Sequence, residues 1–431
     1  MRMSQSGIPE TRNRPSRRRS VFRLLGLALL GVGFFPDAPS AQEKTAWRID
    51  ALHYLDNTPV RIEIEGDRIG RIIRLPQSDP AAVTDPWVAP GFIDNQVNGY
   101  ASVGFASPGL TVDGIRKVTR AMWTMGVTTY VPTLTTASRE RFLENLAVLA
   151  QAVRDPELAR SIPGFHMEGP FISPVDGFRG AHPKAWVRKP DWDEFLAWNR
   201  AADGKIVQVT LAPEAEGAVD FIRKCTALGI VAALGHHNGS ADQIRQAVDA
   251  GACVSTHLGN GCANTIHRHD NPLWPQLADG RLMASCIADG FHLRPEEVQV
   301  FFKVKGPDRL FLTTDIVEMA GMPPGEYRWE GQTVLVTPEG KLTIPAQNVL
   351  AGASMPIGRG IRNVLAWTGC SLADAVHMAS RNQARLLKLE NRGELRSGKR
   401  ADLVLFKLEK EGIRVFRTVL AGKTVYDAAR P

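Results

Sequence analysis

Cysteine is scarce in this chain, which has five among 431 residues. The five are scattered, odd in number and form no Cys-x-x-Cys pair. Three of them lie within or beside apolar runs that are typical of core strands. This pattern argues against a disulfide framework or a cysteine-based metal cluster. We expect buried unpaired thiols, and a single disulfide between two of the cysteines is the alternative.

Long hydrophobic runs are also missing. The apolar run at residues 24–35 has about 12 residues, whereas a membrane-spanning helix needs roughly 20. It follows an arginine cluster and precedes small residues that end at Ala41. The sequence therefore predicts a signal peptide over residues 1–41, an exported and periplasmic protein, and no stable membrane insertion after the signal is removed. Residues 16–22 loosely resemble a twin-arginine signal, and an uncleaved anchor is the alternative.

The positive charge of the chain is not spread over its length. The formal net charge is +7, but residues 1–41 contain seven arginines and only two acidic residues. The remaining chain is nearly neutral, so we expect no nucleic-acid partner. Hydrophobic residues make up 44% and charged residues 23%, which is typical of a globular protein.

No glycine-rich dinucleotide loop follows the first predicted strand. Eight short apolar strands alternate with helical segments, which predicts a parallel sheet closed into a (β/α)8 barrel over residues 90–349. A doubly wound open sheet is the alternative. Period-two alternation at both ends predicts a small β-sandwich domain built from residues 42–89 and 350–431. The predicted barrel strands cover residues 91–94, 128–133, 164–168, 207–211, 231–236, 253–257, 284–289 and 310–315.

Five of these strands end in a side chain that binds metals or transfers protons. The carboxyl ends of barrel strands converge on one mouth, so residues far apart in the sequence meet there. Two histidines and a carboxylate suit a divalent ion, with zinc the default, and such an ion activates water and polarises a carbonyl. Asp315 is then placed to take a proton from the water and return it to a leaving nitrogen, although a strand-end cap is the simpler reading. The five residues are Glu168, His236, His257, Asp289 and Asp315.

The order and spacing of several motifs resemble the N-acetylglucosamine-6-phosphate deacetylase family of the amidohydrolase superfamily. The resemblance covers essentially all of the chain after the signal segment. Its motifs are Pro90-Gly91-Phe92-Ile93-Asp94, His166-Met167-Glu168-Gly169-Pro170, Leu211-Ala212-Pro213-Glu214, Gly235-His236, Thr256-His257-Leu258-Gly259-Asn260, Ala288-Asp289-Gly290-Phe291-His292 and Thr313-Thr314-Asp315.

The resemblance implies a hydrolase that removes the N-acetyl group of an amino sugar with metal-activated water. It implies Glu168, His236 and His257 as metal ligands and Asp315 as general acid and base. His182 matches the family histidine near the substrate carbonyl. The implied sugar-binding and phosphate-binding residues are Asn260, Gly261, Arg268 and His292.

Two further expectations follow from the resemblance. Many amidohydrolases carry His-x-His on the first strand, which supports a second metal, but Gln96 and Asn98 stand here. We therefore expect one ion. The resemblance also favours a homodimer in which phosphate-site residues cross between subunits.

The chain departs from the family pattern beside the substrate site. It reads Gly259-Asn260-Gly261-Cys262 after the histidine motif, and His267 and His269 follow as extra ligands or as surface residues. Together with export, this suggests an unphosphorylated N-acetylhexosamine or cell-wall fragment as a substrate. N-acyl-amino-acid hydrolysis on the same scaffold and a non-catalytic periplasmic sugar-binding protein remain as alternatives.

Overall fold

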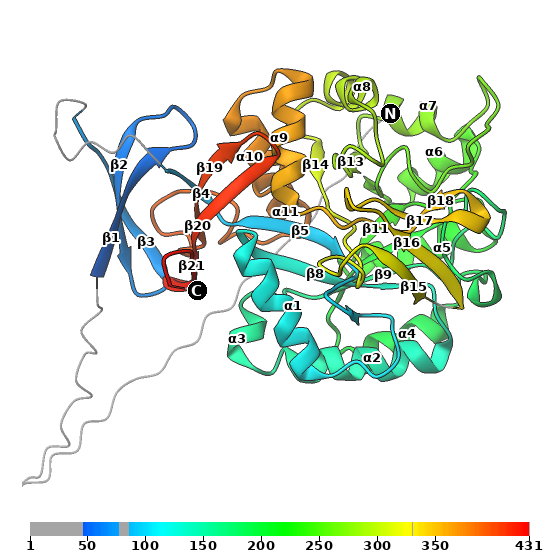
Figure 1. Ribbon diagram of the computed structural model, residues 1–431. Coiled ribbons are helices and arrows are strands. Elements are labelled where there is room, and N and C mark those ends of the chain that lie inside the picture. The colour runs from blue at the N-terminus through cyan, green and yellow to red at the C-terminus, as the bar shows by residue number, and fades with distance from the viewer. Residues whose placement is uncertain (1–45, 77–85, 330, 431) are drawn as a thin grey trace, which may run out of the picture. The chain divides into compact units, whose positions relative to one another are not determined.

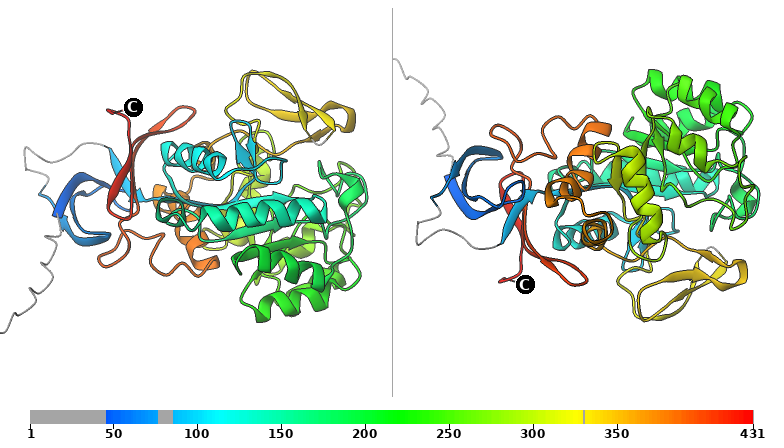
Figure 2. Two further views of the ribbon diagram at one scale, coloured as in Figure 1. Left: turned by 90° about the horizontal axis from the view of Figure 1, so that it is seen from below. Right: turned by 90° about the horizontal axis from the view of Figure 1, so that it is seen from above.

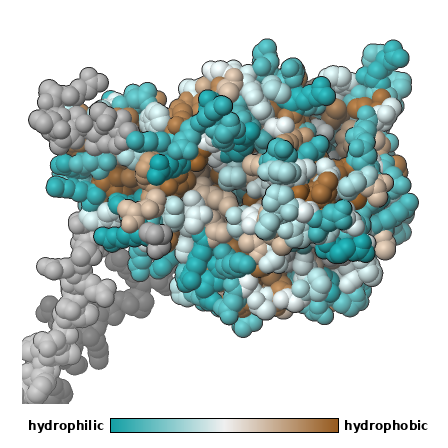
Figure 3. Space-filling view, in the orientation of Figure 1, coloured by the Kyte–Doolittle hydropathy of each residue, from teal (hydrophilic) through white to brown (hydrophobic). Residues whose placement is uncertain are grey.

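The computed structural model describes residues 46–76, 86–329 and 331–430. The predicted signal peptide lies outside these residues. Within them, no helix combines the length and the hydropathy that crossing a membrane requires. Hydrophilic side chains cover most of the face seen in Figure 3.

Eight parallel strands form the central sheet, in the order of the sequence and with helices outside them (Figure 1). Each predicted barrel strand corresponds to one of them, so the predicted barrel is confirmed. The strands are β5 (Phe92–Val97), β8 (Val127–Thr135), β9 (Phe165–Glu168), β10 (Ile206–Leu211), β11 (Val231–Leu234), β12 (Val254–Ser255), β13 (Met283–Cys286) and β14 (Leu310–Leu312).

The helices between these strands follow from local sequence signals. In α6 (Ala241–Asp249), Ser240 and Gln243 form a capping box, and Ile244, Ala247 and Val248 make one buried face. This spacing is that of an amphipathic helix lying against a sheet. The other helices of this region are α1 (Val112–Thr124), α2 (Arg139–Ala152), α3 (Pro156–Ala159), α4 (Trp192–Ala201), α5 (Ala218–Ala227), α7 (Leu273–Ala278) and α8 (Pro295–Lys305).

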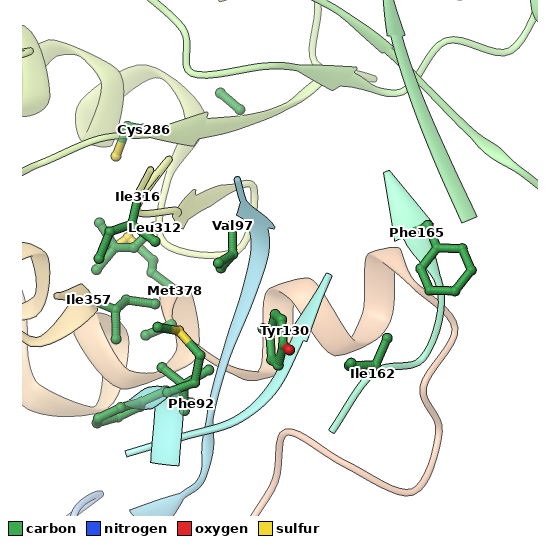
Figure 4. Close-up of a cluster of buried hydrophobic side chains, with 14 of the residues drawn as sticks. Phe92, Val97, Tyr130, Ile162, Phe165, Cys286, Leu312, Ile316, Ile357 and Met378 are labelled. Atoms are coloured by element: carbon green, nitrogen blue, oxygen red, sulfur yellow. The ribbon is translucent and has the colours of Figure 1, made fainter. Parts of the chain in front are cut away.

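The first and last strands, β5 and β14, are joined largely by side chains. Gln383 lies in α11 (Arg381–Leu386), and its amide nitrogen donates to the carbonyls of Ile93 and Leu312. Its amide oxygen accepts from the N–H of Asn95 at 2.8 Å. Main-chain hydrogen bonds between the two strands begin further along the chain, where Asp315 N donates to Gln96 O at 3.1 Å. Apolar side chains, including Phe92, fill the space beside this seam (Figure 4).

Replacing Gln383 with leucine is expected to lower the free energy of unfolding by about 3 kcal/mol, because it leaves buried backbone groups without partners. Thermal denaturation measures this change. The control is Gln246→Leu, on the exposed face of α6, which should change the melting temperature little. Equal effects of the two substitutions would contradict the role given to Gln383.

A second sheet joins the two ends of the described chain. Its order is β21-β20-β19-β4-β1-β2-β3, and β4 pairs with both β1 and β19. The predicted boundaries of the small domain stay predictions. Within the predicted segment 350–431, α9 (Ile357–Thr368) and α11 contact barrel strand β14. The strands are β1 (Ala46–His53), β2 (Pro59–Glu65), β3 (Arg68–Arg74), β4 (Trp87–Pro90), β19 (Leu403–Glu409), β20 (Gly412–Leu420) and β21 (Lys423–Asp427), and α10 (Leu372–Met378) lies between α9 and α11.

A four-stranded antiparallel sheet follows β14 and projects from the barrel (Figure 2). It has a small apolar core of its own, to which Val334, Leu342 and Ala181 belong. Ala181 precedes His182, so this sheet supports the segment that carries a predicted site residue. Its strands are β15 (Gly325–Trp329), β16 (Gln332–Val336), β17 (Leu342–Ile344) and β18 (Val349–Leu350).

Candidate active site

Glu168, His236 and His257 meet at the carboxyl ends of three barrel strands. Glu168 is the last residue of β9, and each histidine lies two residues beyond the end of its strand. The Nε2 atoms of His257 and His236 lie 2.9 Å and 3.4 Å from Glu168 Oε1. One ligand atom from each of the three buried residues lies within 4.8 Å of the others. The structure thus brings together the three predicted metal ligands.

The chemistry of this cluster fits a divalent ion. His236 Nδ1 faces the carbonyl oxygen of Phe178 at 3.2 Å, and a carbonyl only accepts, so Nδ1 carries the proton. The Nε2 lone pair is then available to an ion that Glu168 also binds. Burial opposes a charge on Glu168, but the neighbouring imidazoles of His236 and His257 hold the pKa of its carboxyl well below its usual range. A charged carboxylate with two imidazole nitrogens is a typical zinc-binding set.

The backbone is strained at three predicted site residues. His236, His257 and Asp315 have φ angles of 53°, 31° and 56°, in the left-handed region that side chains other than glycine rarely adopt. Each such residue costs about 1–3 kcal/mol and persists only where its surroundings hold it. The N–H of His257, for example, donates to Ser285 Oγ at 2.6 Å. This strain is typical of residues whose direction matters for chemistry.

Gln96 connects Asp315 to the cluster, and Asn98 also binds Asp315. Gln96 Nε2 donates to Glu168 Oε1 at 2.8 Å and to Asp315 Oδ1 at 2.9 Å. Asn98 Nδ2 also donates to Asp315 Oδ1, at 2.6 Å. Both bonds engage the same oxygen, which leaves Oδ2 to exchange a proton. Burial, followed by the charge of Glu168, raises the pKa of Asp315 to about 6.

His182 lies beside the cluster as a neutral hydrogen-bond donor. Its ring centroid is 4.3 Å from that of His236, and burial lowers its pKa well below the usual value. The N–H of Thr136 donates to His182 Nδ1 at 3.3 Å, so the ring proton is on Nε2. A neutral imidazole with this tautomer can donate to a developing oxyanion.

A cavity of about 460 Å³ opens over these residues, and Asn98, His182, Asn260, His292 and Asp315 are among those that line it. Asn260 Nδ2 is buried and has no hydrogen-bond partner among the described residues, so it is available to a substrate. Gly261 also lines the cavity, and a Cβ atom there would lie 2.9 Å from His236 Nδ1. A side chain at position 261 would therefore displace His236.

Other predicted residues are placed differently. Asp289 lies outside the ligand cluster, because its carboxylate accepts from His292 Nδ1 at 2.8 Å and from two N–H groups of the turn after β13. It orients His292 and is no metal ligand in this arrangement. Arg268 is exposed and does not line the cavity, so its phosphate contact stays a prediction.

The two extra histidines occupy the exposed loop before α7. His267 Nδ1 accepts from the N–H of Asp270 at 2.8 Å, which closes the turn. The ring of His269 lies 6.2 Å from that of His267, and both residues are exposed. His267 thus has a structural role in its own loop.

Several residues of the site were not predicted from the sequence. Thr136 follows the end of β8, so its place at a strand end was a usable signal. Phe178 contributes only its backbone carbonyl to the site, so its side chain gives no signal in the sequence. Trp329 and Asn348 reach the cavity from the projecting sheet, whose strands pair only with one another among the described residues.

Residues 87–427 match the model of the amidohydrolase family. This chain belongs to the amidohydrolase family. It is 31% identical over 387 residues to N-acetylglucosamine-6-phosphate deacetylase of Vibrio furnissii, covering 89% of this chain and 92% of the relative. It is 35% identical over 358 residues to the Bos taurus enzyme of the same name, covering 80% and 85%.

Solved structures of the amidohydrolase family have the same fold. A mutant N-acetyl-D-glucosamine-6-phosphate deacetylase from Mycobacterium smegmatis, in complex with N-acetyl-D-glucosamine-6-phosphate, superposes with a TM-score of 0.76 at 32% identity. The match covers 85% of this chain and 94% of that one. A Thermotoga maritima deacetylase matches with a TM-score of 0.78 at 25% identity, covering 89% and 100%. The resemblance read from the motifs is thereby confirmed.

Proposed function

We propose that this amidohydrolase removes the acetyl group from an N-acetylated amino sugar, releasing acetate and the free amine. The observation that carries the proposal is the Glu168, His236 and His257 cluster with Asp315 joined to it through Gln96. A sugar-binding protein needs no proton-transferring carboxylate beside such a cluster. The names of the relatives support the amino sugar as the substrate.

Each residue has a defined part in this reaction. When bound, the single ion, which we propose to be zinc, supplies Lewis-acid activation of the attacking water and of the amide carbonyl. Asp315 takes a proton from the water and delivers it to the nitrogen as the C–N bond breaks. His182 donates Nε2–H to the carbonyl oxygen as negative charge develops there. Asn260, Gly261 and His292 hold the sugar in the cavity.

The proposal of one ion is supported by Gln96. Its amide nitrogen donates to Glu168 and Asp315, so it occupies the space between two carboxylates that a second ion would need. Replacing Gln96 and Asn98 together with histidine is expected to raise the metal content from about one to about two ions per chain. Elemental analysis after dialysis measures this. Gln96→Asn with Asn98→Gln is the control that keeps amides at both positions, and an unchanged content in the histidine variant would contradict the argument.

The remaining parts of the proposal concern substrate and location. We propose a periplasmic protein exported by the signal at residues 1–41, and a homodimer. Arg268 lies exposed outside the cavity of its own chain. That position supports a contact with a substrate phosphate or carboxylate in the second subunit.

A substrate panel tests the proposed reaction. Acetate and free amine should appear in equal amounts from N-acetylated sugars, while N-acyl amino acids should react much more slowly. Preference for N-acyl amino acids would assign a different amide to the same site.

A further inference from the structure

Asp94 is a buried carboxylate near the top of the barrel seam. It lies in β5, two residues before Gln96, and its side chain is inaccessible to solvent. Its Oδ1 atom accepts from Thr313 Oγ1 at 2.9 Å, and its Oδ2 atom accepts from Thr314 Oγ1 at 2.5 Å. The N–H groups of Thr314 and Gln96 also donate to Oδ1, at 3.2 Å and 3.3 Å.

These bonds fix the backbone directly before Asp315. Among the described residues, no main-chain hydrogen bond joins Asp94 to Thr313 or Thr314, and those between the two segments begin at Gln96 and Asp315. Asp94 is therefore the group of β5 that holds Thr313 and Thr314 in place. The next residue, Asp315, has the strained φ of 56°, and its N–H donates to Gln96 O at 3.1 Å. Asp94 thus binds Thr314, which precedes the donor residue of that bond, and Gln96, whose carbonyl accepts it.

A carboxylate is the side chain that this place requires. Its two oxygens accept four hydrogen bonds here, and a carboxylate has about four acceptor sites. An asparagine would offer one acceptor oxygen, and its NH2 group would face the Thr314 hydroxyl in the place of Oδ2, or three donors in the place of Oδ1. Burial raises the pKa of Asp94 to about 6, and the hydrogen bonds from Thr314, Thr313 and Gln96 oppose that rise. Asp94 does not line the cavity, so contact with a substrate is not the reason.

We infer that Asp94 is a positioning residue for the reaction: by binding Thr313 and Thr314 it sets the direction in which Asp315 faces the attacking water. This inference rests on the proposed function, in which Asp315 transfers the proton. The first-strand motif thus has a role in catalysis as well as in barrel closure.

Kinetics of matched variants test the inference in the metal-loaded full chain. Asp94→Asn is expected to lower kcat by on the order of 10- to 100-fold with KM changed by less than about 3-fold, because misdirection of a reacting group affects the chemical step. Thr314→Val, which removes the hydroxyl that bonds to Oδ2, should behave in the same way. Thr314→Ser keeps that hydroxyl and should retain kcat within about 3-fold of the wild type.

Gln383→Leu is the control for barrel closure alone. It weakens the same seam, so it should lower the melting temperature at least as much as Asp94→Asn while it keeps kcat within about 3-fold of the wild type. The inference is overturned if Asp94→Asn keeps its kcat, if it loses metal, or if Thr314→Ser loses as much activity as Thr314→Val.

Amide hydrogen exchange separates this inference from the proposed function. Asp94→Asn should accelerate exchange at residues 313–317, and Thr314→Ser should not, whatever substrate the protein uses. Absence of acetate release by the wild type would refute the proposed function, and the exchange result would still decide whether Asp94 holds this segment. Unchanged exchange in Asp94→Asn would overturn the inference by itself.

Discussion

Replacing Asp315 with asparagine is expected to reduce kcat for acetate release by about 100- to 10,000-fold, because an amide cannot take the proton from water. The substitution preserves the shape of the side chain, and its oxygen can still accept from Gln96 and Asn98. Metal content and substrate affinity should therefore stay close to those of the wild type. Steady-state kinetics, elemental analysis and substrate titration measure the three quantities.

Asp203→Asn is a matched control for Asp315→Asn. Asp203 also has a left-handed backbone, with a φ of 51°, but it lies on the surface in an ion pair with Arg154. Its replacement should leave kcat unchanged. If Asp315→Asn keeps more than about a tenth of the wild-type kcat, Asp315 is not the proton-transferring group.

Removal of the metal by a chelator is expected to lower acetate release by at least about 100-fold, and added zinc should restore it. The melting temperature should fall as well, because an ion that binds the folded state alone stabilises it, by about 2.7 kcal/mol at 100 times its Kd. His236→Ala leaves two ligands and should prevent both metal uptake and the recovery of activity. Activity and elemental analysis before and after treatment measure these effects.

His237→Gln is the control for the ligand variant. His237 is the neighbouring residue and is also buried, but it lies outside the ligand cluster. This variant should retain its ion. Full activity of the wild type after complete loss of metal would contradict the account of the site.

The barrel and the ligand cluster were predictable because both follow from local patterns. Short apolar runs mark the strands, and polar residues at their ends converge once the strands are parallel. Glu168, His236 and His257 meet in the structure for this reason.

Other parts of the barrel and of the site depend on contacts between distant segments and were not predictable. Gln383 bonds to both edge strands from about 290 residues beyond β5, and no periodicity indicates this pairing. Asp289 lies three residues beyond the end of its strand, as Asp315 does, yet its carboxylate binds His292 in the turn after β13. The projecting sheet forms its own pairs among the described residues, so nothing in its strands indicates that Trp329 reaches the cavity.

Acetate release by the metal-loaded protein is the measurement that tests the central claim most directly. N-acetylglucosamine 6-phosphate and N-acetylglucosamine should be compared side by side. The account predicts equal amounts of acetate and free amine from at least one of them, and the preference between them shows whether Arg268 contributes a phosphate contact. No acetate from either sugar, with one ion bound per chain, would contradict the proposal that this site deacetylates amino sugars.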